Sequence, residues 1–502
     1  MTVVGISSFG TMGVNGYAVS VECLISPGMP QFDIVGLADT AVKESRERIR
    51  AAIKSCGITF PSGRVTVNLA PADTKKAGTA YDLPVLLAIL AAADIITQPE
   101  KSCAFIGELS LAGELRRVRG ILPMALAAAE SSIKRIYVPE ANAAEAALAE
   151  GVEIIAVPDL AFLISVLKGE KEVTPFPAPG AIAPDYSSLP DFSLVTGQYT
   201  ARRALEIAAA GGHNVLMKGP PGSGKSLLAS CLPSILPEMS RAELLETTKI
   251  HSVAGLLNSK TPFVSSRPFR APHHTISAVG LTGGSQYLTP GEISLANNGV
   301  LFLDELPEFP KTSLEALRQP LESGEVTISR VTGSATYPSR FMLVCAMNPC
   351  RCGWYGYGDK CRCSERDAQA YRRRISGPML DRIDIFVDVP ALEYSELDTR
   401  EPGESSASIR ARVNAARAVQ RERFKGTGVE CNARMGVDLL REYCTLDSAS
   451  RAMMSSAFTA LGLTARSYDR ILRVARTIAD LEGAEEISSA HIAETLSYRE
   501  NL

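Results

Sequence analysis

Short apolar runs alternate with amphipathic helical patterns over the first third of the chain. Strand-like runs lie at 31–35 and 64–69, and apolar residues recur at helical spacing over 42–54 and 83–92. Strands that alternate with helices of this length are typical of α/β domains. The pattern therefore predicts an α/β domain over residues 1–170.

The alternation stops in a proline-rich, aperiodic stretch at 171–190, which predicts a semi-extended linker. Beyond it, continuous apolar runs at 214–217, 299–303 and 341–347 are typical of parallel strands that are buried on both faces. We therefore expect a second α/β unit, the core, over residues 191–390.

Helical patterns dominate from residue 405 onward, as at 408–424 and 467–481. They predict a helical lid over residues 391–502. The fold class expected for the whole chain is α/β, with an N-terminal α/β domain, an α/β core and a C-terminal helical lid.

A complete phosphate-binding pattern, G-x-x-x-x-G-K-[ST], follows the run at 214–217. It consists of Gly219, Pro220, Pro221, Gly222, Ser223, Gly224, Lys225 and Ser226. Its glycines let backbone N–H groups approach phosphate oxygens, and a helix that begins after the loop adds a positive field. In such a loop Lys225 reaches the β- and γ-phosphates and Ser226 binds Mg²⁺, so ATP and Mg²⁺ are the expected cofactors. A glycine-rich turn that matches by chance is the alternative.

Polar side chains end the next two apolar runs. Asp304 and Glu305 follow the run at 299–303, and Asn348 follows the run at 341–347. Open α/β sheets bind ligands at the carboxyl ends of their strands. We expect Asp304 to support Mg²⁺, Glu305 to orient and deprotonate the attacking water, and Asn348 to hold the water or the γ-phosphate. An acidic pair in a solvated turn is the alternative, which the upstream phosphate loop disfavours.

Two arginines lie far from the phosphate loop in sequence. Arg382 follows a helix-like segment, and Arg466 stands at the start of the helical pattern at 467–481. Both are candidates for neutralising charge during phosphoryl transfer, one supplied by the same subunit and one by a neighbour. On the residues alone, surface salt bridges are an equal alternative.

Taken together, these positions resemble the Walker A, Walker B, sensor-1, arginine-finger and sensor-2 positions of AAA+ ATPases. In that order they are Lys225, then Asp304 with Glu305, Asn348, Arg382 and Arg466. Three strings, PHHTIS at 272–277, NNGVLFLDE at 297–305 and NPCRCG at 348–353, resemble the magnesium-chelatase-like YifB/ComM family. The similarity extends over essentially the whole chain. It implies a motor domain like those of the chelatase ATPase subunit and the MCM helicases.

The resemblance also implies a function. The family includes a hexameric branch-migration helicase of natural transformation, so we expect a homo-hexameric ATPase ring that moves branched or single-stranded DNA in homologous recombination. An ATP-driven protein remodeller, either a chelatase-type insertase or a Lon-like protein-handling factor, is the alternative from a different class. Stimulation of ATP turnover by branched DNA, or instead by a protein substrate, discriminates between the two.

The N-terminal part resembles the proteolytic domain of Lon and the Lon-like domain of RadA. The segments that carry this resemblance are 106–115, 126–129 and 136–142. A peptidase of that type needs a serine nucleophile and a lysine base. The resemblance puts Thr79 or Ala80 at the serine position and Leu122 at the lysine position. Because leucine cannot act as a base, we expect a fold reused for binding or assembly, without a Ser-Lys dyad.

The chain has eleven cysteines, and four of them form two C-x-C pairs separated by eight residues. These four are Cys350, Cys352, Cys361 and Cys363. Glycines between the pairs allow the loop to fold back, so that four thiolates can surround one tetrahedral Zn²⁺. The usual spacing is C-x-x-C, and free or redox-active thiols are the alternative. We expect a zinc-binding insertion at 350–363.

Two loops are candidates for a surface that moves against a substrate. They are the glycine-rich insertion at 278–290 and the hairpin-like segment at 324–334. By resemblance to the helix-2 insertion and the pre-sensor-1 hairpin of MCM-type motors, both would face a central pore. Arg330 would then contact DNA phosphate and Tyr287 would stack on a base. Surface hairpins without such a role are the alternative.

Composition narrows the choice of compartment and partners. The N-terminus carries no signal-like pattern, and the longest apolar stretch, 83–96, is too short to span a membrane and contains Asp94. We therefore expect a cytoplasmic protein without a membrane partner. The net charge of −3 argues against a globally basic nucleic-acid binder, although a ring can be basic in its pore alone.

Overall fold

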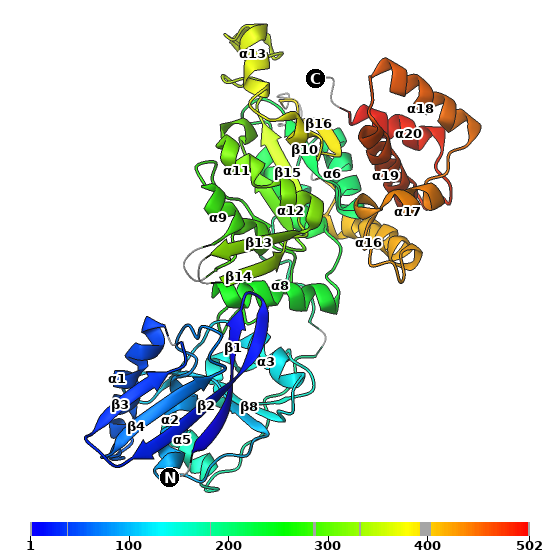
Figure 1. Ribbon diagram of the computed structural model, residues 1–502. Helices are drawn as coiled ribbons and strands as arrows, with labels where there is room; N and C mark the ends of the chain where they lie inside the picture. The colour runs from blue at the N-terminus through cyan, green and yellow to red at the C-terminus, as the bar shows by residue number, and fades with distance from the viewer. Residues whose placement is uncertain are drawn as a thin grey trace.

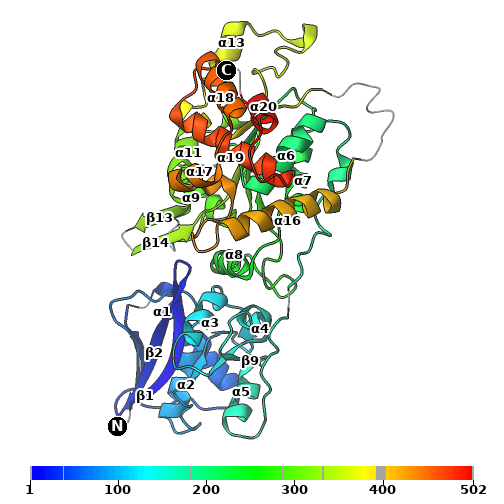
Figure 2. The same ribbon diagram turned by 90° about the vertical axis from the view of Figure 1, so that its right-hand side faces the viewer.

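The computed structural model describes residues 3–37, 39–180, 182–284, 288–330, 333–391 and 403–499. Three parts follow one another along the chain. The N-terminal part is drawn in blue and cyan, the core in green and yellow, and the C-terminal helices in orange and red (Figures 1 and 2).

The N-terminal part is a mixed sheet with helices on both faces. In the described residues its strand order is β3-β4-β2-β1-β5-β8-β9. The strands are β1 (Val4–Met12), β2 (Asn15–Ser26), β3 (Gln31–Val35), β4 (Arg64–Ala70), β5 (Cys103–Phe105), β8 (Arg135–Pro139) and β9 (Glu153–Val157), and a small ribbon joins β6 (Glu108–Leu109) to β7 (Leu115–Arg116). The helices are α1 (Thr40–Ser55), α2 (Asp82–Ala92), α3 (Ile121–Ala129), α4 (Glu140–Ala146) and α5 (Leu160–Leu167).

Two hydrophobic cores lie on opposite faces of this sheet. One contains side chains of α1, α2 and α5, and the other contains side chains of α3 and α4. Strand β4 buries Val65, Val67 and Leu69, every second residue, as a strand with one covered face does. The strands and helices expected in this part are confirmed; the bounds of one strand agree and the others shift by one or two residues.

The core is a parallel sheet flanked by helices. Its strand order in the described residues is β11-β12-β15-β10-β16. The strands are β10 (Val215–Lys218), β11 (Phe269–Arg270), β12 (Val300–Leu303), β15 (Met342–Met347) and β16 (Ile385–Asp388). The helices are α6 (Tyr199–Gly211), α7 (Lys225–Cys231), α8 (Arg241–Ala254), α9 (Ala278–Thr282), α10 (Glu292–Leu295), α11 (Lys311–Glu315), α12 (Arg318–Ser323), α13 (Glu365–Arg372) and α14 (Gly377–Leu380). Strands β12 and β15 are buried along their whole length, which explains their continuous apolar sequence.

The C-terminal part is helical, as expected. Its helices are α16 (Ser406–Arg423), α17 (Val437–Tyr443), α18 (Ser448–Ala460), α19 (Ala465–Leu481) and α20 (Ser489–Ser497). Helices α16 and α19 pack against α6 of the core (Figures 1 and 2). Inside this part the buried carboxylate of Asp480 accepts hydrogen bonds from Arg423 at 2.5 Å, Arg476 at 3.0 Å and Asn432 at 2.8 Å. The network ties α16 to α19.

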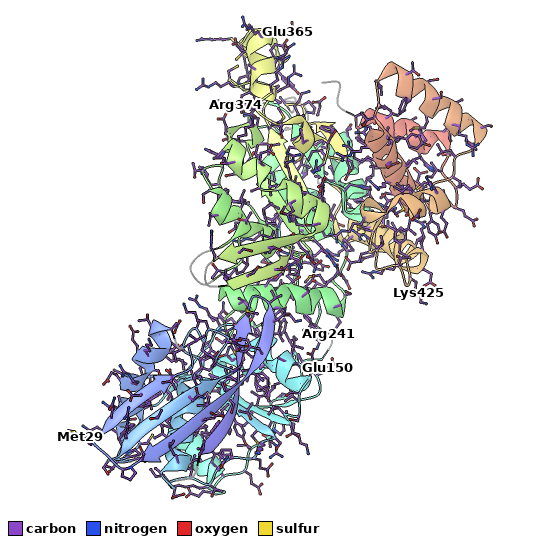
Figure 3. The ribbon with its side chains drawn as sticks, viewed as in Figure 1. Met29, Glu150, Arg241, Glu365, Arg374 and Lys425 are labelled. Carbon is purple, nitrogen blue, oxygen red and sulfur yellow. The ribbon has the colours of Figure 1, made fainter. Side chains whose placement is uncertain are left out.

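Helix α8 joins the N-terminal part to the core (Figure 1). Leu122 of α3 and Leu148 form a small buried cluster with Leu244 of α8. Arg241, at the start of α8, donates a hydrogen bond to the Leu148 carbonyl oxygen at 3.0 Å and lies 3.3 Å from Glu150 (Figure 3). A leucine cluster, a hydrogen bond and an ion pair therefore join the N-terminal part to the core.

A second contact between the two parts involves two hairpins. The turn between β1 and β2 reaches the hairpin of β13 (Glu325–Arg330) and β14 (Gly333–Pro338). A Cβ added at Gly13 would lie 3.1 Å from the Cβ of Ala335, and Val14 packs against the core cluster. The N-terminal sheet therefore contacts the core at a hairpin as well as at α8.

The proline-rich stretch is irregular. Residues 171–180 and 182–190 form no helix or strand in the part of the chain that is described. Phe176 N–H bonds to the Ile154 carbonyl oxygen at 2.7 Å, so the stretch begins along the N-terminal sheet. Among the described helices, none is both long and apolar enough to cross a bilayer.

Candidate functional site

The phosphate-binding pattern forms the turn between β10 and α7. Gly222 and Gly224 have φ values of +77° and +91°, in the left-handed region that favours glycine. At Gly219 a Cβ would lie 2.0 Å from the Val389 carbonyl oxygen, so this position admits no side chain. The loop therefore has the exposed backbone and the following helix that a phosphate cradle requires.

Lys225 is buried within this loop. Its ammonium group donates hydrogen bonds to the carbonyl oxygens of Gly219 at 2.8 Å and Pro220 at 2.7 Å, and to the Ser223 hydroxyl at 3.3 Å. Burial lowers its pKa from the ordinary value. A lysine held by carbonyl oxygens at the floor of a phosphate loop can transfer its bonds to phosphate oxygens.

The expected metal-binding pair is brought together across the sheet. The Ser226 hydroxyl donates a hydrogen bond to Asp304 Oδ2 at 2.7 Å, although the two residues are 78 positions apart. Asp304 Oδ1 accepts the Glu305 N–H at 2.9 Å. A hydroxyl and a carboxylate oxygen at this separation suit one Mg²⁺ together with phosphate oxygens and water. These residues fit the cofactors expected from the sequence.

Glu305 has a neighbour that the sequence did not assign. Its backbone lies in the left-handed region, with φ +53°, which is uncommon for a non-glycine residue. Its Oε2 lies 3.5 Å from His274 Nδ1, and the His274 ring packs beside His273 with 4.0 Å between ring centroids. The His-His string was part of the family resemblance, and only the folded chain indicates that it can position Glu305.

Asn348 follows β15 at the same edge of the sheet. The Gly219 N–H bonds to the carbonyl oxygen of Met347 at 3.2 Å, which joins the phosphate loop to the end of β15. A Cβ at Gly353 would lie 3.9 Å from Asn348 Cγ and 2.5 Å from Pro221. The segment after β15 therefore packs directly on the phosphate loop.

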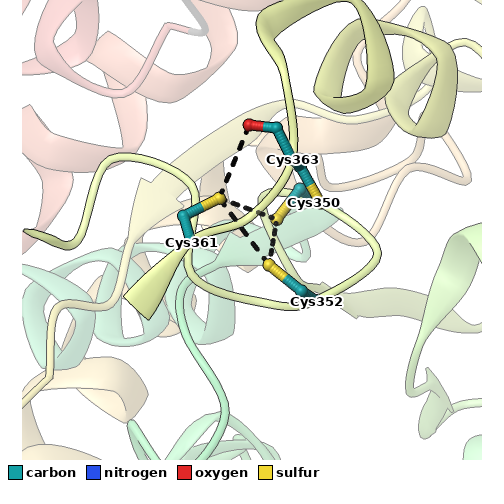
Figure 4. A group of neighbouring side chains, drawn as sticks. All are labelled: Cys350, Cys352, Cys361 and Cys363. Carbon is teal, nitrogen blue, oxygen red and sulfur yellow. Dashed lines mark hydrogen bonds between the residues drawn. The ribbon is translucent and has the colours of Figure 1, made fainter. Parts of the chain in front are cut away.

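The four clustered cysteines lie on this same segment (Figure 4). All four are free thiols, and their Sγ atoms lie within 4.8 Å of one another. Backbone N–H groups of Arg362 and Trp354 donate to the Cys352 sulfur and lower the pKa of that thiol to about 6. Beyond the cluster, the chain continues into the projecting helix α13, which begins at Glu365; Arg374 lies just after its end (Figure 3).

The two expected arginines lie together, but away from the phosphate loop. Arg382 and Arg466 line one cavity of about 530 Å³, and none of its described lining residues belongs to the phosphate loop or to the acidic pair. The cavity includes Asn214, which precedes β10, whereas the phosphate loop follows β10. The Asn214 amide donates to the Arg382 carbonyl oxygen at 2.8 Å and thereby fixes Arg382 at the amino end of the strand.

This arginine cavity has a strongly charged lining. Its described residues include six arginines, at positions 340, 382, 434, 466, 470 and 473. Arg382 pairs closely with Glu322, yet its buried Nε has no hydrogen-bond partner among the described residues. The described lining also contains four carboxylates, those of Glu322, Asp381, Asp384 and Asp469, so arginines outnumber carboxylates by two.

An acidic side chain anchors the floor of the arginine cavity. Asp384 accepts the Asn214 N–H at 3.0 Å, and His213 Nδ1 lies 3.6 Å from the same oxygen. Burial opposes ionisation of Asp384, but the His213 ring and the Asn214 N–H outweigh it and hold the pKa below its ordinary value. The carboxylate therefore stabilises the folded protein in its ionised form.

The hairpin expected at 324–334 extends further than the sequence indicated, to Pro338. Its buried face joins the core through Val326 and Ile328. On its exposed face, hydroxyl groups pair across the strands, Thr327 with Thr336 and Ser329 with Ser334.

Of the two residues expected to contact DNA, only Arg330 lies within the described part of the chain. Exposed Arg330 ends β13 and donates to the Gly284 carbonyl oxygen at 3.0 Å, so the hairpin and the glycine-rich insertion touch. Tyr287, the other expected DNA contact, lies outside the described residues.

The positions that resemble a peptidase site have structural contacts. Leu122 is fully buried against α8, and the Thr79 hydroxyl donates a hydrogen bond to Glu108. Leu122 thus serves the contact between the N-terminal part and the core.

Comparison with known proteins gives matches along most of the chain. Residues 191–397 match the family "Magnesium chelatase, subunit ChlI", residues 21–142 match "Subunit ChlI of Mg-chelatase", and residues 403–499 match the C-terminal part of that subunit. The chain is 42% identical to competence protein ComM of Haemophilus influenzae, over 99% of this chain and 98% of that protein. It is also 42% identical to YifB of Escherichia coli, over 97% and 95% of the two chains. The magnesium-chelatase 38 kDa subunit of Cereibacter sphaeroides is 27% identical over 32% of this chain and 52% of its own length.

Proposed function

The chain belongs to the magnesium-chelatase-like AAA+ family that includes ComM and YifB, and we propose that it is a ring-shaped ATPase that drives DNA branch migration. Family membership supports ATPase activity and assembly into oligomers. The observation that carries the DNA part is the 42% identity to a competence protein over 99% of the chain. Natural transformation and homologous recombination in the cytoplasm are the processes that we propose it serves.

In the proposed ATP site each polar group has its own task. Bound Mg²⁺ neutralises phosphate charge, and the Ser226 hydroxyl and the Asp304 carboxylate, 2.7 Å apart, would hold it. Lys225 would exchange its carbonyl partners for phosphate oxygens. Glu305 would orient the attacking water and accept its proton, with His274 beside the carboxylate to fix its direction.

The arginine cavity supports a site that is shared between subunits. Asn348 lies on the phosphate-loop edge, whereas Arg382 and Arg466 lie at the amino ends of the strands. In a ring, the amino-end face of one subunit would meet the phosphate-loop edge of the next. We therefore propose that both arginines act on the neighbour's ATP, so hydrolysis depends on assembly; a homo-hexamer is the expected ring.

The hairpin of β13 and β14 is the proposed DNA contact. Its exposed hydroxyl pairs can donate to phosphate oxygens, and Arg330 adds a positive charge where the hairpin meets the glycine-rich insertion. Contacts of this kind hold the DNA backbone and do not read the sequence. This suits a motor that must act on any branched DNA.

A four-way DNA junction tests the proposal. ATP turnover should rise with the junction or with single-stranded DNA, and binding should weaken steeply with salt. Arg330→Ala should reduce this stimulation with basal turnover unchanged, and should lower the slope of log affinity against log salt by about 1. Arg135→Ala, an exposed arginine on β8 that is remote from the hairpin, is the matched control and should alter neither.

Two results would contradict the DNA proposal. Assembled rings that move a four-way junction no faster than Glu305→Gln rings, with ATP and Mg²⁺ at low salt, would end it. Turnover that rises with a partner protein and ignores DNA would favour an ATP-driven protein remodeller, which the likeness to a chelatase subunit keeps as the second candidate.

A further inference from the structure

The cysteine cluster has the donor atoms and the dimensions of a metal site (Figure 4). Cys350 Sγ lies 3.3 Å from Cys352 Sγ and 3.9 Å from Cys361 Sγ, and the last two are 3.6 Å apart. Sulfurs bound at about 2.3 Å to one tetrahedral Zn²⁺ lie roughly 3.8 Å from each other. A disulfide would instead need about 2.05 Å. The spacing therefore fits a zinc-thiolate tetrahedron completed by Cys363.

The loop between the two pairs is built to hold this arrangement. The Gly353 N–H bonds back to the Cys350 carbonyl oxygen at 3.0 Å and closes a turn around the first pair. The Lys360 ammonium lies 4.5 Å from the centre of the Trp354 ring, a cation–π contact within the loop.

Gly353 of the same loop lies close to Pro221 of the phosphate loop. Gly353 directly follows the ligand Cys352 and has a φ of +87°. A Cβ there would lie 2.5 Å from both Cδ and Cγ of Pro221, well inside van der Waals contact. Asn348 lies two residues before Cys350. The cluster is thus joined directly in sequence to the end of β15 and to the residue that packs on the phosphate loop.

We propose that the four cysteines bind one Zn²⁺ and that the metal-bound loop holds the phosphate loop and Asn348 in place. The loop has only a short 3-10 turn of its own, Gly358–Lys360, so a bound metal would supply the order that backbone bonds do not. Loss of the metal would then release Gly353 from Pro221. The zinc part stands alone, whereas the coupling to ATP rests on the proposed ATPase function.

Metal content tests the first part. The full chain, purified without chelator, should contain about one zinc per chain, because a tetrahedron of four thiolates saturates at one ion. The double variant Cys350→Ser with Cys361→Ser should lose at least about nine-tenths of this zinc, since two ligands cannot hold it. Cys56→Ser, a partly exposed cysteine outside the cluster, is the matched control and should keep it. Alkylation of the four thiols should begin only after a chelator is added.

Two matched glycines test the coupling. Gly353→Ala and Gly356→Ala carry the same left-handed strain, at φ +87° and +86°, but a Cβ at Gly356 meets no described atom within 4 Å. Gly353→Ala must move Pro221 by about 1 Å, a displacement that can lower kcat about 100-fold. It should keep its zinc and lose ATP hydrolysis. Gly356→Ala should keep both.

The outcomes test the zinc site and its coupling to ATP hydrolysis separately. Zinc near zero with four freely alkylated thiols, or iron in place of zinc, overturns the metal assignment. Zinc at one per chain with equal hydrolysis by Gly353→Ala and Gly356→Ala overturns the coupling. If the wild-type chain neither binds nor hydrolyses ATP, the proposed function and the coupling fail together, and the metal content still decides the zinc site.

Discussion

Mixing of two inactive variants tests whether ATP sites are shared between subunits. Arg382 and Arg466 line a cavity at Asn214, and the phosphate loop begins at Gly219 on the other side of β10. A strand advances about 3.3 Å per residue, so Asn214 and Gly219 are roughly 16 Å apart. An arginine side chain does not span this distance. Both arginines are therefore expected to serve the phosphate loop of a neighbour.

The expected recovery follows from the statistics of the ring. Lys225→Ala disables one face of each subunit and Arg382→Ala disables the other. With random mixing at equal amounts, about a quarter of the heterologous interfaces combine two intact faces. An arginine that stabilises the transition state contributes about 10³–10⁵ in kcat, so these interfaces carry nearly all the turnover. The mixture should recover about a quarter of the wild-type ATPase rate.

The matched control mixes Arg382→Ala with Arg466→Ala. Both changes lie on one face, so every interface lacks one arginine and the mixture should stay at the rate of the single variants. Recovery in this control would show that Arg466 serves its own subunit, which refutes the shared face. Absence of recovery in the first mixture at every ratio, with ring assembly verified by light scattering, would refute a role for Arg382 across the interface.

Three further predictions concern single side chains. Lys225→Ala should abolish binding of a fluorescent ATP analogue, because Lys225 neutralises phosphate charge in the ground state. Glu305→Gln should still bind the analogue but should no longer release phosphate from ATP. Tight binding by Lys225→Ala would contradict the assignment of Lys225. Asp480→Ala should lower the free energy of unfolding in urea by about 3–5 kcal/mol, because it leaves buried guanidinium groups unpaired. Glu422→Ala, an exposed carboxylate, should change it by less than about 0.5 kcal/mol, and equal effects would reject the buried network. The pKa of Asp384 is held below its ordinary value. Its stabilisation is therefore present above the unfolded pKa of about 3.9 and lost as the pH falls below it. As the pH falls, the difference in unfolding free energy between wild type and Asp384→Asn should therefore become smaller. A difference that stays constant with pH would contradict a stabilising role for the ionised Asp384.

Elements with a strong local signal could be predicted from the sequence. The strand Gln31–Val35 has the predicted bounds, and α19 ends at the predicted residue, Leu481. In such elements the spacing of apolar residues reflects which face is covered, and this spacing can be read from a few neighbouring residues. The pairing of Ser226 with Asp304 was also foreseeable, because both follow strands of one parallel sheet and such loops meet at one edge.

The place of the arginines depended on pairing between distant strands. Strand β16 lies beside β10, with Val215 opposite Ile385, and this register puts Arg382 at the amino end of β10. Nothing in the local pattern around Arg382 indicates which strand will be its neighbour, because parallel strands are joined by long connections and their partners lie far away in sequence. The sequence therefore identified the residue type and left open which ATP it serves.

Close contacts between loops were beyond the sequence for a related reason. The contact of Gly353 with Pro221 joins residues 132 positions apart, and neither lies in a periodic element. The same holds for Leu122. On the sequence it was only a leucine where a peptidase needs lysine, but in the folded chain it packs against Leu244 of α8. A leucine at this position excludes a peptidase base but does not indicate what the side chain packs against, because its partner lies in a distant part of the chain. The role of the N-terminal sheet therefore has to be sought at α8 and at the hairpin of β13 and β14, where it contacts the motor.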